Sequence, residues 1–375
     1  MQKQSIALAI LGTMSVYGTV VLAGDVTIYG VADVGLNYSH VKTGDANAKD
    51  KVTMKSGQES GSRLGIRGSE DLSPDVRAGF VLETGFDLDN GRLDQNDRLF
   101  GREANLYVLT PYGELSLGRV GGIGGGDGSY GLLSNINPFG TSWGDYATNI
   151  SNFMVSATRM DNTITYLTPA WDGLQFSAQY SLKAASDADD LAYTPGEEGK
   201  SNANRYMALG VSYTNGPWQL IATIDSMDYA NTLPYGEDNS IVATIGGSYY
   251  FACVKTYVGM QYFDKAVMSL ISGSRDIAFA EVSNVPLEGY GVTIGADMPM
   301  ASGTVKVAAG WLDAEEVDHR DHSFDRYGAT IGYEYHLSQR TNFYTAASYM
   351  KTTYDFGEKT DQKATEVLAG IRHIF

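Results

Sequence analysis

Apolar and polar residues alternate along most of the chain with a period of two. Such a period places successive side chains on opposite faces of a β-strand. In Leu174–Ser181, for example, Leu, Phe, Ala and Tyr occupy every second position, and Gln or Ser occupies each position between them. The same pattern, with less regular segments included, predicts sixteen strands, at residues 26–36, 62–69, 77–88, 101–109, 114–120, 163–167, 174–181, 205–213, 218–225, 241–249, 255–263, 289–297, 304–311, 326–336, 342–350 and 367–375.

The connections between these strands alternate in length. Short ones such as Thr110–Gly113 and Ser338–Thr341 follow long polar ones such as Leu182–Asn204 and Asp264–Glu288. An even number of strands, with short turns at one end and long loops at the other, is what an outer-membrane barrel requires. The barrel must close, because an open edge in lipid would leave backbone groups unpaired. We therefore predict an all-β fold, a 16-stranded antiparallel transmembrane β-barrel, wide enough for an aqueous channel.

One long connection, Gly121–Asn162, departs from this regular plan. A structureless connection of about 40 residues inside a compact domain is improbable unless it is functional. Its glycine-rich start, Gly121–Gly128, lacks the Lys-Ser/Thr pair of a phosphate-binding loop, and a strand rather than a helix flanks it on each side. A flexible surface loop is the plain alternative. We interpret residues 121–162 as a loop that folds into the barrel and narrows it.

The first 23 residues are typical of a secretory signal peptide. They contain one basic residue, Lys3, then an apolar run and a small-residue cleavage site at Val21-Leu22-Ala23. Removal of residues 1–23 would leave 24–375 as the barrel domain and, because Lys3 is lost, would change the net charge from −17 to −18. Elsewhere no apolar run approaches the ~20 residues that a transmembrane helix needs.

Composition and charge exclude several kinds of site. The acidity argues against a nucleic-acid partner bound through bulk positive charge. The single cysteine, Cys253, cannot form an internal disulfide. The run Asp318–His322 contains two histidines, but it lies in a predicted external loop with no second cluster, and we interpret it as a solvent-exposed loop. We expect no metal site and no cofactor.

Several segments, spread along the whole mature chain, resemble the general trimeric porins of Gram-negative outer membranes, in the variant found in β-proteobacteria. The resemblance implies a homotrimer for passive diffusion of ions and small hydrophilic solutes, with the third extracellular loop folded into the pore. It also implies Sec-type export, contact with outer-membrane lipid and lipopolysaccharide, and recognition of the C-terminal Phe375 by the barrel-assembly machinery. The segments are Val26–Leu36, Ser62–Leu72, Ala78–Phe86, Leu99–Val108, Gly113–Arg119 and Leu368–Phe375.

The resemblance also implies a ladder of basic wall residues that faces acidic groups on the inserted loop. Arg63, Arg102 and Arg159 match its positions. Arg159 shares a strand face with Thr163 and Thr165, which supports an inward direction. Opposed charges at a narrow throat create a transverse field that filters ions. The plain alternative is that these arginines pair with nearby carboxylates and brace the wall.

This chain departs from the family pattern at the loop. Asn137–Gly140 lacks the acidic residue that relatives usually carry there, which leaves Asp127 and Asp145 as the loop carboxylates. Which of the two faces the arginines stays open. Because the usual acidic partner is missing, we expect a throat that favours anions. Strand parity places Glu103 on the outer face beside inward Arg102, and we therefore expect Glu103 at a subunit interface rather than in lipid. A basic residue that enteric relatives often carry near the first strand is replaced by Val31.

Other functions are weighed against the general channel. A substrate-specific channel would need an aromatic track in the lumen, but most aromatic residues here share the lipid-facing parity. A receptor or adhesin role of the external loops is compatible with a pore. An enzyme would need a Ser–His pair, and His336, the one inward-facing histidine that we considered, has no serine motif to go with it. We predict that the protein is not an enzyme.

Overall fold

The computed structural model describes residues 26–188, 193–234, 238–267 and 285–375. The predicted signal peptide, residues 1–23, lies outside them. Three one-turn helices accompany the strands: α1 (Asp94–Asp97), the 3₁₀ helix η1 (Leu133–Ile136) and α2 (Ile150–Phe153). In the described part of the chain, no helix has the length and apolarity to cross a membrane.

Strands make up most of the described chain. In order they are β1 (Val26–Thr43), β2 (Lys49–Ser56), β3 (Arg63–Ser73), β4 (Val76–Gly85), β5 (Glu103–Thr110), β6 (Gly113–Gly121), β7 (Arg159–Leu167), β8 (Leu174–Ser181), β9 (Arg205–Asn215), β10 (Trp218–Asp228), β11 (Ile241–Phe251), β12 (Val254–Val267), β13 (Pro286–Met300), β14 (Gly303–Glu316), β15 (Ser323–His336), β16 (Thr341–Asp355) and β17 (Lys359–Ile374).

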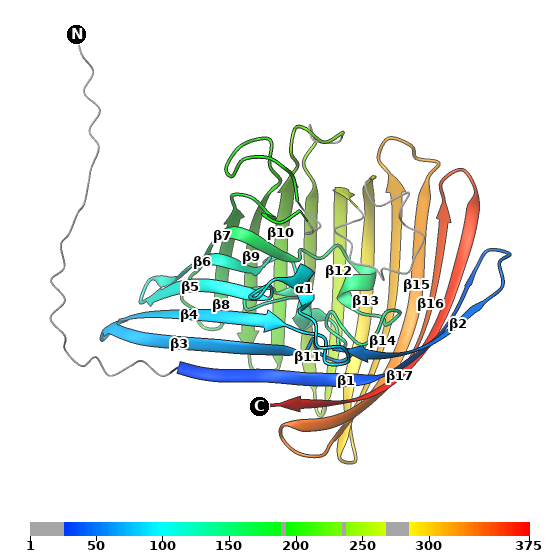
Figure 1. Ribbon diagram of the computed structural model, residues 1–375, viewed down its shortest axis with the longest axis horizontal. Helices are drawn as coiled ribbons and strands as arrows, with labels where there is room; N and C mark the ends of the chain where they lie inside the picture. The colour runs from blue at the N-terminus through cyan, green and yellow to red at the C-terminus, as the bar shows by residue number, and fades with distance from the viewer. Residues whose placement is uncertain (1–25, 189–192, 235–237, 268–284) are drawn as a thin grey trace, which may run out of the picture.

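The strands form one closed sheet. From β3 to β17 each strand pairs antiparallel with the next, and β17 pairs with β1, so that the first and the last strand lie side by side (Figure 1). Both β2 and β3 pair with the same edge of β1, β2 beside Val34–Val41 and β3 beside Val26–Val31. The seventeen strands therefore occupy sixteen positions around the wall, which confirms the predicted 16-stranded antiparallel barrel.

The interruption between β2 and β3 was not predicted, because the sequence analysis treated residues 37–61 as a loop. In the structure β1 and β2 form a hairpin instead. Residues 57–62 then leave the wall, and Asp33 holds them: its Oδ2 accepts hydrogen bonds from the backbone N–H groups of Glu59 (2.9 Å) and Ser60 (2.7 Å). Gly57 turns the chain with a φ of 67°, a conformation that glycine adopts at little steric cost. Gln58 and Glu59 are buried as a result, and the chain returns to the wall at Arg63.

The two faces of the wall differ as the alternation predicted. Leu209 and Ile294 are exposed on the outer face, whereas Thr244 and Thr293 are buried on the inner face. An apolar exterior suits lipid, and the polar groups of the interior are available for water or for an inserted loop. The long connections begin at the end of the barrel opposite to the C-terminus, and the short turns lie at the same end as the C-terminus and the start of β1 (Figure 1).

Candidate pore constriction

The segment between β6 and β7, residues 122–158, contacts the inner face of the wall. Hydrogen bonds fasten it at separate strands. The N–H of Thr148 donates to Thr330 on β15 (2.7 Å), and the N–H of Val155 donates to the amide oxygen of Gln261 on β12 (2.6 Å). Gln261 returns a bond to the carbonyl of Val155 (2.8 Å). These bonds tie the segment to the half of the barrel built by the later strands.

Glycines on the same inner face allow the segment to approach the backbone of the wall. A Cβ added at Gly291 would collide with the carbonyl oxygen of Phe153, and one added at Gly310 would lie 2.7 Å from the Phe153 ring. Phe153 is completely buried. Close approach of another backbone is a common reason for glycine within a strand. Glycine at these positions therefore provides the surface on which the segment packs.

On its other side the segment faces a polar cavity. This cavity has a volume of about 700 Å³ and lies against β1, β3 and β4. Arg63, Arg102 and Arg159, the three arginines selected from the sequence, all line it, and so does Asp127. Asp145 is not among the residues that line it. The structure thus brings four of the five predicted residues to one place.

Arg63 and Arg102 share a carboxylate that the sequence analysis missed. Glu83 on β4 accepts a hydrogen bond from Arg102 Nε at 2.7 Å, and its other oxygen lies 3.8 Å from Arg63 Nε. The hydroxyl of Tyr29 donates to the same carboxylate (3.0 Å). The sequence did contain a signal for Glu83. It follows the apolar Leu82 in the alternating pattern of this strand, and the position after an apolar residue faces water.

Arg159 pairs with the loop. Its Nη1 lies 3.3 Å from Oδ2 of Asp127, and Thr141 also donates to that carboxylate (3.2 Å). The positive charge of Arg159 holds the pKa of Asp127 below its usual value, so that the carboxylate is ionised at neutral pH. Asp127 is therefore the loop carboxylate that faces the arginines.

Asp145 has a different partner. Its carboxylate forms an ion pair with Lys55 on β2. Its backbone N–H donates to Glu366 on β17 at 3.0 Å. Lys55 lies on a strand that the sequence analysis did not predict, so this partner could not be anticipated. Asp145 fastens the segment to the wall and does not compensate the arginines.

The expectation for Glu103 was wrong. Glu103 is only 4% exposed and lines the cavity, where it accepts hydrogen bonds from Ser129 (2.9 Å) and Asn105 (3.1 Å). The parity was counted from Arg102, but β5 begins at Glu103, and the chain bends at the residue before it. Glu103 consequently points inward and gives no support for a polar subunit interface.

The sequence analysis expected arginines without acidic partners at the throat, and this expectation was also wrong. Glu83 forms ion pairs with Arg63 and Arg102, and Asp127 forms one with Arg159. Among the described residues, the cavity is lined by three arginines and by the carboxylates of Glu59, Glu83, Asp94, Glu103 and Asp127. Each of the three arginines therefore has a carboxylate partner, and Arg63 and Arg102 share one.

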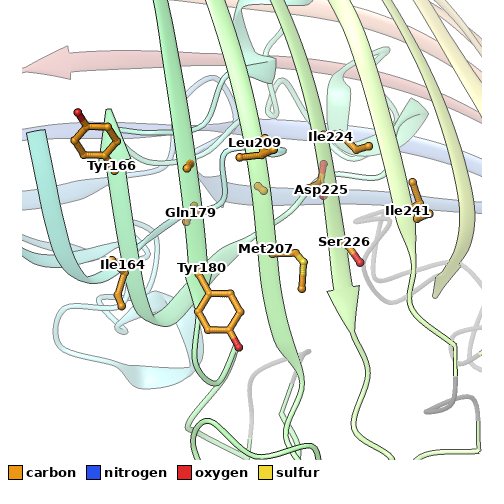
Figure 2. A pocket seen from close by; sticks show the side chains of 12 residues that line it. Ile164, Tyr166, Gln179, Tyr180, Met207, Leu209, Ile224, Asp225, Ser226 and Ile241 are labelled. Carbon is orange, nitrogen blue, oxygen red and sulfur yellow. The ribbon is translucent and has the colours of Figure 1, made fainter. Parts of the chain in front are cut away.

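A second hollow, of about 580 Å³, lies on the outer face of β7–β11. Figure 2 shows the side chains that line it, among them Ile164, Tyr166, Met207 and Leu209. These four side chains are exposed and have the outward parity of their strands. The hollow belongs to the lipid-facing surface and is separate from the channel.

Comparisons with known proteins agree with this architecture. The Gram-negative porin family matches residues 7–355. An outer membrane porin protein of Bordetella pertussis is 31% identical over the whole of both chains, and outer membrane porin protein 32 of Delftia acidovorans is 27% identical, again over the whole of both.

Solved structures share the fold. An anion-selective porin from Comamonas acidovorans gives a TM-score of 0.69 at 24% identity, covering 94% of this chain and 100% of that one. An outer membrane protein of Vibrio cholerae in its trimer form gives a TM-score of 0.57 at 15% identity, covering 94% of this chain and 100% of that one. The chain therefore belongs to the Gram-negative porin family and forms a multi-pass channel of the outer membrane through which small hydrophilic solutes diffuse passively.

Proposed function

We propose that the diffusion path is narrowest between residues 121–162 and the wall formed by β1, β3 and β4. The observation that carries this proposal is the cavity in which Arg63, Arg102 and Arg159 face Asp127. The segment is bonded to the later strands, so the space left for solutes lies on the arginine side. Solutes would pass between a basic wall and an acidic loop.

We further propose that this throat discriminates only weakly between anions and cations. Each of the three arginines has a carboxylate partner, and paired charges produce a shorter-ranged field than single ones. Acidic groups in the external loops lie beyond a Debye length, ~8 Å at physiological salt, and are screened. The Comamonas porin is anion-selective, but likeness of fold alone does not transfer selectivity to this chain.

The reversal potential of single channels in a KCl gradient tests this proposal. We expect a chloride-to-potassium permeability ratio within about threefold of one, because in a water-filled path a compensated pair shifts the energy of a passing ion by only ~0.2 kcal/mol. A ratio far from one in either direction would show that part of the charge is uncompensated.

A general diffusion channel is favoured over a substrate-specific one. Among the described residues that line the cavity, only Tyr29 and Phe139 are aromatic, and the Tyr29 hydroxyl is bonded to Glu83. Two rings do not make a track along which a sugar or a peptide could slide. Competition between unrelated small solutes in a liposome-swelling assay should therefore be absent. Saturable uptake of one solute would favour the specific channel.

We propose that the functional unit is a homotrimer. Support comes from the Vibrio cholerae protein of the same fold, which has a trimer form. The outer face of β3–β5 presents the apolar side chains of Leu64 and Leu106, which neighbouring subunits could cover. Chemical crosslinking of native protein in detergent should give trimers. Migration as monomers alone would refute this assembly.

We also propose that Phe375 is the signal for the barrel-assembly machinery and that the exposed wall contacts outer-membrane lipid and lipopolysaccharide. Phe375 is exposed on the outer face, and its backbone exchanges two hydrogen bonds with Gly30 of β1, at 3.0 and 3.1 Å. It therefore lies at the closing seam. Deletion of Phe375 should reduce the amount of assembled barrel. Phe343→Ala, which removes another exposed aromatic ring of the wall, is the matched control and should not.

A further inference from the structure

Three potential metal ligands meet where β14 turns into β15, at the end of the barrel that carries the long loops. Nδ1 of His319 lies 3.1 Å from one oxygen of Glu316, and Nδ1 of His322 lies 2.5 Å from the other. The ligand atoms of all three side chains lie within 4.8 Å of one another. The sequence analysis noticed both histidines but not Glu316, which is the last residue of its strand.

The turn that carries these groups is held by its own backbone. The N–H of His322 donates to the carbonyl of His319 (2.8 Å), and the N–H of Glu316 donates to the carbonyl of His322 (3.0 Å). The His322 ring packs on Phe356, with ring centroids 5.0 Å apart. The side chains of Glu316 and His322 are 14% and 26% exposed, whereas that of His319 is 61% exposed. Glu316 and His322 are thus held by their surroundings, and His319, whose ring stacks on that of His322 at 5.3 Å between centroids, is the ligand most open to solvent.

Neighbouring charges favour a cation at this place. Asp318 and Asp321 flank His319 and His322 in the same turn. The nearest positive side chain in sequence, Arg320, is engaged by Glu288 (2.8 Å) and by Glu315 (3.5 Å). Its guanidinium is therefore already compensated.

We propose that Glu316, His319 and His322 form a binding site for a Zn²⁺-like divalent cation. Two imidazoles and one carboxylate are a ligand set that zinc accepts, with water completing the coordination. Mg²⁺ and Ca²⁺ prefer oxygen ligands and should not compete. Cu²⁺ and Ni²⁺ belong to the same class as Zn²⁺ and should also bind. A bound ion would link the end of β14 to the start of β15 and fasten this turn at the channel mouth.

Calorimetric titration of ZnCl₂ into untagged, detergent-solubilised protein tests the proposal. We expect one saturable site per chain that EDTA reverses and that MgCl₂ does not occupy. His319→Ala, His322→Ala and Glu316→Gln should each weaken Zn²⁺ binding by at least tenfold, since even loss of a group behind the ligands costs 10–100-fold at known sites. Unchanged single-channel conductance of the variants would show that the barrel itself is intact.

His40→Ala is the matched control. His40 also pairs with a carboxylate through Nδ1, with Asp50 at 2.9 Å, in the hairpin of β1 and β2. Among the described residues it belongs to no group of three metal-binding side chains. Its loss should leave the Zn²⁺ affinity unchanged. The proposal is overturned if wild-type protein shows no saturable Zn²⁺ binding, if His319→Ala and His322→Ala bind as wild type does, or if His40→Ala weakens binding equally.

Discussion

Replacing Glu83 by Gln should shift the channel strongly toward anions. The substitution keeps the size of the side chain and an acceptor for the Tyr29 hydroxyl, but it removes the negative charge that Arg63 and Arg102 share. Arg63 and Arg102 line the cavity, so the charge that becomes uncompensated faces the proposed path of the ions.

The size of the shift follows from Coulomb's law. An uncompensated charge about 6 Å from a permeating ion is worth roughly 0.7 kcal/mol at the dielectric constant of water and roughly 2.8 kcal/mol at an effective value of 20. A compensated pair with its charges about 3 Å apart, similar to the 2.7 Å of Arg102 and Glu83, gives roughly 0.2–0.9 kcal/mol at the same distance. The substitution therefore changes the energy of each ion by the difference, roughly 0.5–1.9 kcal/mol, in opposite directions for chloride and potassium. Because 1.4 kcal/mol is a factor of ten, the chloride-to-potassium permeability ratio should rise by about fivefold to 500-fold.

The assay is the reversal potential of single channels in a planar bilayer with a KCl gradient. Asp297→Asn is the matched control: it removes a carboxylate that is also paired, with Lys306 at 3.2 Å, but that does not line the cavity. The control should change the ratio by less than about twofold, since the lost charge lies outside the throat. Adding Arg102→Ala to Glu83→Gln should return the ratio toward that of wild type.

Two outcomes would refute this reasoning. The first is an unchanged ratio in Glu83→Gln, with the protein still forming open channels. It would mean that ions do not pass close to Arg63 and Arg102. The second is an equal shift in Asp297→Asn, which would show that total lumenal charge, and not the throat, sets the preference.

Two further predictions concern the inserted segment. Asp127→Asn should also shift the preference toward anions, because it leaves Arg159 without its carboxylate partner. The pKa of Asp127 is lowered, so its charge persists below the usual ~4 for Asp. The difference in reversal potential between wild type and Asp127→Asn should therefore survive down to about pH 4 and vanish only in stronger acid. Gly291→Ala should push Phe153 away from the wall, which moves the segment and alters single-channel conductance. Overpacking should also lower the free energy of unfolding by about 1–3 kcal/mol, measured by thermal unfolding. Unchanged conductance and stability would contradict the packing described for Gly291.

The alternation of apolar and polar residues was sufficient to predict the barrel, because lipid on one side and water on the other impose a period of two on each wall strand. It failed where the strands are irregular. Asn162 has a φ of 52°, and the register of β6 and β7 shifts between Gly118 and Val120. Parity could therefore not be carried from Thr163 to Arg159, although Arg159 does line the cavity.

The charge partners at the cavity could be predicted less well than the arginines themselves. Arg63 and Arg102 could be identified because they lie in segments that resemble the porin family. Their pairing with Glu83 depends on how the neighbouring strands and the bend at Arg102 come together in the folded barrel. The same is true of Lys55, because its strand β2 pairs with β1 and ends just before the residues that Asp33 holds away from the wall. Periodicity indicates which face a residue occupies, but not which residue lies opposite.

The central proposal is that ions pass between residues 122–158 and the wall that carries Arg102. The most direct test is the single-channel current of Cys253→Ser/Arg102→Cys before and after reaction with a bulky maleimide. Wild type is the control, because its Cys253 is exposed in the short turn between β11 and β12, away from the cavity. We predict that the current of the variant falls by at least half on modification while that of wild type does not change. Complete modification at position 102 with an unaltered current would contradict the account.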